Sequence, residues 1–308
     1  MSSPAVRSPV YFAAASVIGF ATLAAVPMIG SDYSTSLMIS LLMYANLATA
    51  WGIFCGTTRL VSLASVAFFG VGCYTAAAFG EQMPWPLLLG VAALGGGVLA
   101  LLIGLCTLRL SGMYFVVFSF GVAELIRQVV TWSEAKWLGS VGRYVFVETT
   151  SAQIYWKLLA LLAVVWALGA WLARSRLGFS LRLIGEDEVA ARTCGINTVA
   201  VKLAVLTITS ALMAVAGAIV APRWTYIDPS IAFNAVVSFQ VVVMALLGGV
   251  AAFYGPVLGV IPLVLAFEVL TKYFPNHFSI VLGVIFLLIV YLIPGGLLGV
   301  ARRMRGRP

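Results

Sequence analysis

The sequence predicts an all-α fold, a polytopic transmembrane helical bundle of about ten spans, some of them interrupted. Hydrophobic residues make up 62% of its 308 residues and charged residues only 9%, whereas soluble domains carry roughly 25% charged residues. Apolar runs long enough to cross about 30 Å of hydrocarbon recur along the whole length. We therefore expect a single transmembrane domain over residues 1–308, with the lipid bilayer as its solvent.

The apolar runs and the charged or turn residues between them place the spans. Tyr11–Gly30 could be mistaken for a signal peptide, but it is long, lacks an A-x-A cleavage pattern and leads directly into another apolar run. The expected spans are residues 10–30, 35–55, 60–79, 86–107, 113–132, 155–173, 199–221, 235–251, 255–271 and 279–299.

The basic residues indicate which side each loop occupies. With both termini in the cytoplasm, twelve of the 18 Lys and Arg residues lie inside, as the positive-inside rule expects. These residues are Arg7, Arg59, Arg109, Arg174, Arg176, Arg182, Arg192, Lys202, Arg302, Arg303, Arg305 and Arg307. They sit in short loops rather than on one surface, which argues against a nucleic-acid partner. The segments 132–155 and 222–234 then form the larger outer loops.

Small residues and glycine pairs predict how the helices pack. The small residues four apart, which allow close helix contact, are Gly72, Ala76 and Gly80, then Ser210, Ala214 and Ala218, then Gly255 and Gly259. The segments 61–74 and 237–256 each hold a glycine pair and read as interrupted spans in opposite directions, a pattern typical of inverted repeats that frame a transport path. The candidate path residues are Ser62, Ser65, Phe68, Phe69, Tyr74, Gln240, Gly248 and Gly249.

Two acidic residues fall within apolar spans. Such residues are functional candidates by default, because burying a charge is costly. However, Arg127 follows Glu124 by three residues and Lys272 follows Glu268 by four, so each pair can neutralise itself near a helix end and snorkel outward. We favour that structural interpretation, and we expect the lone His277 to be solvated.

Several function classes lack the residues that they need. No Gly-Lys dipeptide occurs, so there is no P-loop for ATP, and neither H-E-x-x-H nor G-x-S-x-G is present. Four scattered cysteines without C-x-x-C spacing predict no zinc site. The sequence therefore predicts a chain that is not an enzyme, with no catalytic residues, no metal ligands and no cofactor of its own.

A charged insert, GEDEVAARTCGIN at residues 185–197, interrupts this apolar chain on the cytoplasmic side. Its three acids suit a first helical turn, Gly195 suits a C-terminal stop, and Asn197 suits the N-cap of the next span. We expect a short helix with Val189, Ala190 and Thr193 on one face and a Glu188–Arg192 pair on another. Such a helix either docks in a groove of another protein or is a solvated loop helix.

The order Glu188, Ala190, Ala191, Gly195 resembles the E-A-A, three residues, G pattern of ABC importer permeases. The chain is identified as a member of the high-affinity branched-chain amino acid permease family, of the LivM-type subunit, over about residues 40–300. The matching segments are FFGVGCYTAA, LRLSGMYF, AELIR, RSRLGFSLRLIGEDEVAARTCGIN, KLAVLTITSALMAVAGAIVA, MALLGGVAAFYGPVLG and PGGLLG.

The resemblance implies a multi-pass bacterial inner-membrane subunit that works with a LivH-type second permease, two ATPase subunits that bind ATP and Mg, and an extracytoplasmic binding protein. It also implies that the insert is a cytoplasmic coupling helix in a cleft of the ATPase. The coupling residues would be Glu186, Asp187, Glu188, Val189, Ala190, Ala191, Arg192, Thr193, Gly195 and Asn197. Arg59 and Ser65 depart from the family's usual G-Q-L-S-L-G-H segment, and LGSVGRY replaces its usual outer-loop motif, so the cargo stays open.

The outer loop offers a candidate dock for the binding protein, through mixed charges and aromatic side chains: Lys136, Trp137, Arg143 and Glu148. An ordinary exposed loop is the alternative. Branched-chain or related amino acids are the expected cargo, with urea, short amides, or aromatic or carboxylic acids as alternatives. An ion-coupled secondary transporter and a membrane-embedded enzyme are the other classes, and the first of these would need more intramembrane acids than the sequence offers.

Overall fold

The computed structural model describes residues 32–108, 110, 112–137, 139–147, 149–250, 252, 254–273, 278–292 and 296–299. The expected span at residues 10–30, His277, Glu148 and the basic residues after 299 lie outside the described residues. The elements are α2 (Asp32–Thr58), α3 (Ser65–Phe79), α4 (Trp85–Thr107), α5 (Met113–Trp137), β1 (Arg143–Tyr144), α6 (Ser151–Arg174), α7 (Arg176–Glu186), α8 (Glu188–Thr193), α9 (Thr198–Val220), η1 (Ala221–Arg223), β2 (Tyr226–Ile227), α10 (Pro229–Ala232), α11 (Ala235–Gly248), α12 (Gly255–Tyr273) and α13 (Phe278–Leu292).

The described part of the chain is an all-α, polytopic helical bundle, as the sequence predicts. Seven of its helical segments are long and apolar enough to cross a membrane, and α3 is a shorter apolar helix. Every expected span from 35–55 onward overlaps a helix of the described residues, although the span at 60–79 becomes helical only at Ser65. The helices α2 and α9 supply the centre of the bundle, since most of their residues are buried.

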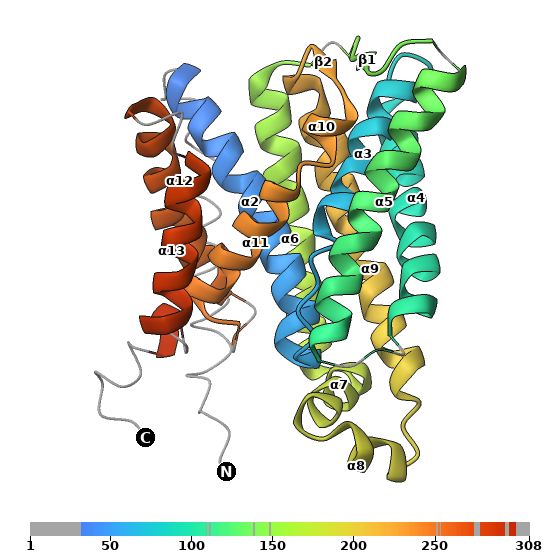
Figure 1. Cartoon of the computed structure of the whole chain (residues 1–308), viewed down its shortest axis with the longest axis vertical. Coiled ribbons are helices and arrows are strands. Elements are labelled where there is room, and N and C mark those ends of the chain that lie inside the picture. The colour runs from blue at the N-terminus through green and yellow to red at the C-terminus, as the bar shows by residue number, and fades with distance from the viewer. Residues whose placement is uncertain are drawn as a thin grey trace.

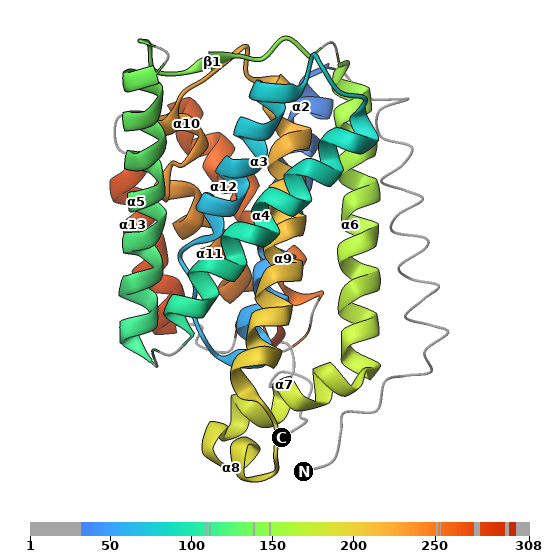
Figure 2. The same cartoon turned by 90° about the vertical axis from the view of Figure 1, so that its right-hand side faces the viewer.

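The two ends of the bundle differ in structure (Figures 1 and 2). The helices α7 and α8 project from the end at which α6 stops and α9 starts, while β1, β2 and α10 cover the opposite end. The strands β1 and β2 pair antiparallel, with Arg143 opposite Ile227 and Tyr144 opposite Tyr226. This small sheet joins the two outer loops that the sequence places on the same side of the membrane.

Small residues bring the helix backbones together, which confirms that part of the prediction. A Cβ atom added at Gly72 of α3 would lie 1.8 Å from the carbonyl oxygen of Ala214 in α9. One added at Gly259 of α12 would lie 2.0 Å from the carbonyl oxygen of Met244 in α11. No side chain fits into gaps of this size, so these helix crossings depend on glycine.

The interruptions only partly match the expected ones. Gly70 and Gly72 lie inside the continuous helix α3, and the non-helical stretch precedes them, where Arg59 adopts a positive φ of 57°. The second break does fall at the expected glycine pair, since α11 ends at Gly248 and Gly249 has a φ of 97°. The expectation for the first span was wrong because its glycines serve helix contact, with Gly70 against Phe233 and Gly72 against α9.

One of the two expected intramembrane ion pairs forms. Arg127 Nε lies 2.9 Å from Glu124 Oε2, which confirms that pair. The pairing of Glu268 with Lys272 is wrong, because Glu268 Oε1 accepts a hydrogen bond from the Tyr33 hydroxyl at 3.2 Å instead. Tyr33 reaches this carboxylate because α2 packs beside α12.

Candidate functional site

The helix α7 begins at a sharp turn directly after α6. The Ser175 hydroxyl accepts a hydrogen bond from the Gly178 amide at 3.1 Å and so caps α7. A Cβ atom at Gly178 would lie 1.7 Å from the carbonyl oxygen of Leu172, so only glycine permits this turn. Leu181 and Ile184 are buried and hold α7 across the end of the bundle. The sequence analysis missed α7, because its apolar face is short and lies beside a longer span.

The expected single helix at 185–197 is in fact the end of α7 followed by the separate helix α8. Asp187 adopts an extended conformation, with φ −151° and ψ 109°, and its carboxylate accepts from the amides of Val189 at 2.8 Å and Ala190 at 3.1 Å. This capping position is incompatible with a continuous helix. Glu186 therefore ends α7, and Glu188 is the first residue of α8, whereas we expected both in one first turn.

The predicted C-terminal stop of α8 and the predicted cap of α9 are both confirmed. Gly195 has a φ of 81°, and its amide donates to the Arg192 carbonyl at 3.0 Å. The Asn197 side chain accepts from the Ala200 amide at 3.1 Å, which caps α9. These local signals explain why the chain leaves α8 and immediately enters a long helix.

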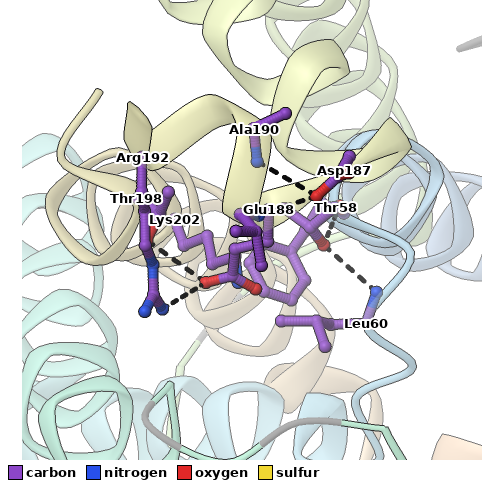
Figure 3. Close-up of polar contacts among 10 residues, drawn as sticks. Thr58, Leu60, Asp187, Glu188, Ala190, Arg192, Thr198 and Lys202 are labelled. Atoms are coloured by element: carbon purple, nitrogen blue, oxygen red, sulfur yellow. Dashed lines mark hydrogen bonds and ion pairs between the residues drawn. The ribbon is translucent and has the colours of Figure 1, made fainter. Parts of the chain in front are cut away.

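Glu188 ties α8 to the membrane helix α9 (Figure 3). Its carboxylate accepts from Lys202 Nζ at 2.6 Å, from Arg192 Nη2 at 2.8 Å and from the Thr198 hydroxyl at 3.2 Å. The Lys202 side chain is only 3% exposed and that of Glu188 31% exposed. The sequence predicted the Arg192 pair, but it did not predict the buried Lys202, which lies fourteen residues away and one helix later.

The charge of Glu188 is stabilised by these partners. Burial by itself would raise the pKa of the Glu188 carboxyl, but the hydrogen bonds from Lys202 and Arg192 outweigh it, so the pKa lies below its ordinary value. A carboxyl whose pKa falls on folding contributes stability that is fully present above the unfolded-state pKa and is lost as the pH falls through the folded-state pKa. The link between α8 and α9 is therefore strongest at neutral pH.

We expect this link to break in acid. A fluorophore on the exposed Cys194, in a variant with the exposed Cys106 replaced by Ser, should show constant anisotropy above about pH 4.5 and falling anisotropy below it, as Glu188 takes up a proton. In Glu188→Gln the anisotropy should be low and independent of pH. A transition of the same size in that variant would show that another group controls the release.

The exposed side of α8 is small and mostly uncharged. Val189 is 71% exposed, Ala190 and Thr193 are also exposed, and Ala191 is the buried residue of this helix. Arg192 lies on a different side, paired with Glu188. The structure thus gives α8 the two faces that the sequence predicted, one available for contact and one attached to α9.

The helix α7 connects this projection to two more membrane helices. A Cβ atom at Gly185 would lie 2.3 Å from the Thr57 carbonyl oxygen, so α7 rests directly on the end of α2. Arg182 Nη2 donates to the Ala173 carbonyl of α6 at 3.0 Å. The projection formed by α7 and α8 is therefore attached to α2, α6 and α9.

At the opposite end, Glu134 connects α5 to two other elements. Its carboxylate accepts from the Tyr74 hydroxyl of α3 at 3.2 Å, from the Gly142 amide at 2.8 Å and from Arg143 Nε at 2.9 Å. The Glu134 side chain is 3% exposed. This buried carboxylate fixes β1, and through it β2, against α3 and α5.

The residues proposed as a dock lie around this end. Trp137 is 76% exposed, and Lys136 Nζ lies 4.8 Å from the ring centroid of Trp132. Arg143 is engaged with Glu134, which restricts its availability. Glu148 lies outside the described residues. Their role in docking stays a prediction.

The candidate path residues fall into two groups. Ser62, Ser65, Phe68 and Phe69 are at most 4% exposed and are covered by this chain's own helices. In this conformation they do not line an open surface. Their role as path residues stays a prediction, and it requires the helices around them to move.

The other candidate path residues are held by specific contacts. The Gln240 side chain accepts from the Tyr44 hydroxyl at 2.5 Å, and Tyr74 donates to Glu134. Gly248 lies against α12, and Gly249 makes the turn that follows α11. Tyr74 and Gln240 are thus polar groups on neighbouring helices, and their role in lining a path also stays a prediction.

Comparison with known proteins identifies relatives over nearly the whole described region. The family model of the branched-chain amino acid transport system permease component matches residues 33–290. The high-affinity branched-chain amino acid transport system permease protein LivM of Salmonella typhimurium is 25% identical over 90% of this chain and 72% of its own length, and LivM of Escherichia coli is 26% identical over 88% and 70%. The corresponding permease protein LivH of Salmonella typhimurium is 30% identical over 53% of each chain. No solved structure matches.

Proposed function

Because the chain belongs to the family of branched-chain amino acid transport system permease components, we propose that it is a transmembrane subunit of an ATP-driven, binding-protein-dependent importer. It is a multi-pass membrane protein and a permease subunit. We propose further that it pairs with a LivH-type permease, that two ATPase subunits bind ATP and Mg, and that a binding protein delivers the cargo. The existence of LivM and LivH relatives supports two different permeases in one system.

The observation that carries this proposal is the anchored projection of α7 and α8. A loop helix that touches nothing needs no buried anchor, yet Glu188 of α8 is bonded to Lys202, which is 3% exposed. The same helix leaves Val189, Ala190 and Thr193 uncovered at the end where α7 and α8 project (Figure 2). A coupling helix needs an exposed contact face and a firm attachment to the membrane helices. The ATPase subunit must not only bind this helix but also transmit its own movement to the membrane helices.

The contacts also provide a route for that displacement. A displacement of α8 would be transmitted to α9 through the contact of Glu188 with Lys202. A displacement of α7 would be transmitted to α2 through the close contact at Gly185. The helix α9 is in backbone contact with α3 at Gly72, and α3 carries several candidate path residues. Closure of the ATPase subunits would therefore shift the helices beside the path, with the interface between the two permeases as the two-state element.

We propose the following finer features on the same basis. The full chain would have about ten spans, with both termini and the projection in the cytoplasm of a bacterium. The relatives named for branched-chain amino acid transport make such amino acids the first cargo to test. Urea, short amides and aromatic or carboxylic acids are the next, because the departures at Arg59 and Ser65 lie next to the candidate path.

A bulky residue on the exposed face of α8 tests the proposal. Ala190→Trp should leave the chain in the membrane but reduce ATP-dependent uptake in reconstituted vesicles at least about tenfold, because a hot-spot contact with the ATPase is blocked. The same variant should lose co-purifying ATPase subunits. The measurement is radiolabelled amino acid uptake together with the subunit composition of the purified complex.

The matched control is Ala152→Trp, the same enlargement at an exposed position of α6 at the other end of the bundle. It should retain the ATPase subunits. Full uptake by Ala190→Trp would exclude α8 as the coupling element. Uptake that persists without ATP and is lost when an ion gradient is removed would exclude the class of ATP-driven importers altogether.

A further inference from the structure

The helix α5 is the least covered of the candidate spans in the described chain. Only 17% of its apolar window is buried, against 39% to 78% in the other candidate spans. It stands at the edge of the bundle, on the opposite side from α6 (Figure 2). Most of its surface must therefore contact lipid, water or another protein.

The uncovered surface of α5 has two different parts. One part is apolar and suits lipid: Tyr114, Phe118, Leu125, Val129 and Trp132. The other part follows helical spacings of three and four after the exposed Val117 and is polar or small from Gly121 onward. We call it the polar flank: Gly121, Glu124, Gln128 and Thr131, with Arg127 beside it. A helix surrounded only by lipid has no reason to separate its outward residues in this way.

The ion pair of the polar flank lies near the middle of the candidate span α5. Glu124 is the twelfth of the 25 residues of α5, so about 18 Å of helix separates it from either end. The side chains of Glu124 and Arg127 are 38% and 30% exposed. We expected this pair near a helix end, from which the side chains could snorkel outward, but the pair lies in the middle of α5, far from both ends.

Exposure of this pair to lipid would be costly. A charged residue at the centre of a spanning helix costs about 2.5–3.5 kcal/mol on insertion scales. Gln128 Nε2 donates to Glu124 Oε1 at 3.1 Å, so the polar groups of the flank support one another without covering the pair. A Cβ atom at Gly121 would meet nothing within 4 Å, so the flank is open.

An aromatic contact places α5 beside α11. Phe120 of α5 packs on Phe239 of α11 with ring centroids 5.9 Å apart, and Phe239 is 38% exposed. The next residue of α11, Gln240, is one of the candidate path residues. The helix α5 therefore lies next to a helix that carries a candidate path residue.

Resting on the proposed function, we propose that the polar flank of α5 is the surface that faces the second permease subunit in the middle of the membrane. The partner would present polar side chains or enclosed water to Glu124, Arg127 and Gln128, and the apolar part of α5 would face lipid. Polar residues within a membrane are stable where they face the interior of a bundle or a hydrated cavity, and the interface between two permeases supplies such a place.

Photo-crosslinking in the assembled transporter tests this surface. Benzoylphenylalanine at Gln128 or Gly121 should crosslink to the second permease, identified by mass spectrometry, at least about fivefold more than at Val129 or Leu125. The two pairs are matched, because each compares adjacent or near positions on one helix. Equal yields from both parts of α5, or crosslinks from the flank to lipid alone, would overturn the proposal. Crosslinks from the flank to a second copy of this chain would overturn it as well.

A charge scan gives an independent measurement. Gln128→Lys places a cation beside the Glu124 carboxylate and should change the amount of assembled complex in the membrane less than about twofold. Val129→Lys should reduce that amount at least about fivefold, because only this second ammonium faces lipid. Equal losses would contradict the assignment. ATP-driven uptake of the unmodified complex is measured in parallel. If the complex shows ATP-driven uptake and contains ATPase subunits but the expected crosslinks do not form, this inference alone is wrong. If the complex shows neither ATP-driven uptake nor ATPase subunits, the proposed function is wrong.

Discussion

Glu188→Ala is expected to detach α8 from the membrane helices and to uncouple transport. The substitution leaves the Lys202 ammonium, 3% exposed, without its carboxylate partner. Removing one partner of a buried ion pair costs about 3–5 kcal/mol, because the remaining charge stays buried and uncompensated. Glu188 is itself partly exposed, so we expect the lower end of that range. Amide exchange over residues 187–196 should accelerate, and ATP-dependent uptake should fall at least about tenfold.

Two control variants separate the buried contact from the exposed one. Arg192→Ala removes the other cation of the cluster, but this side chain is 60% exposed, so the cost should stay below about 1 kcal/mol. The double variant Glu188→Leu with Lys202→Met removes both charges and should recover most of the stability. Equal effects of Glu188→Ala and Arg192→Ala would mean that Lys202 does not anchor α8.

Gly72→Ala is expected to destabilise the bundle strongly, although it adds only one methyl group. The added Cβ atom would lie 1.8 Å from the carbonyl oxygen of Ala214, a backbone atom that cannot turn away. The helices α3 and α9 would have to separate along their whole contact. Overpacking typically costs about 1–3 kcal/mol, and a clash with a backbone atom belongs at the upper end of that range. The yield of folded complex and its midpoint of thermal unfolding in detergent should therefore both fall.

The control is the same substitution at Gly90 of α4. Its Cβ atom would meet nothing within 4 Å, and alanine is a better helix former than glycine by about 0.5–1 kcal/mol. Gly90→Ala should therefore leave the thermal midpoint unchanged or raise it. If both substitutions shift the midpoint of thermal unfolding in the same direction, close contact between α3 and α9 is not what holds the bundle together.

The sequence alone determines the features that depend on neighbours within one or two helical turns. Long apolar runs identify the spans, because bilayer thickness fixes the length of a crossing helix. The stop at Gly195, the cap at Asn197 and the pairs Glu188–Arg192 and Glu124–Arg127 are all confirmed. Each depends on partners within four residues, so chain geometry alone brings them together.

Local reasoning was wrong where a residue with a nearby partner had a better distant one. Glu268 binds Tyr33, 235 residues away, and not Lys272. The glycines of α3 are not a break in the helix, since they face Phe233 and Ala214 of other elements. In both cases the spacing in sequence permits one arrangement, and helix packing selects another.

The candidate site shows most clearly which features the sequence determines and which depend on the tertiary structure. The sequence alone indicates that residues 185–197 form a charged helical insert with a small exposed face, because periodicity and caps are local properties. Only the tertiary structure shows that Asp187 separates two helices, that Lys202 is the buried anchor of Glu188, and that the side chain of Glu124 is left 38% exposed. These depend on which helices lie side by side, and that is decided by the sum of many packing contacts that no short segment contains.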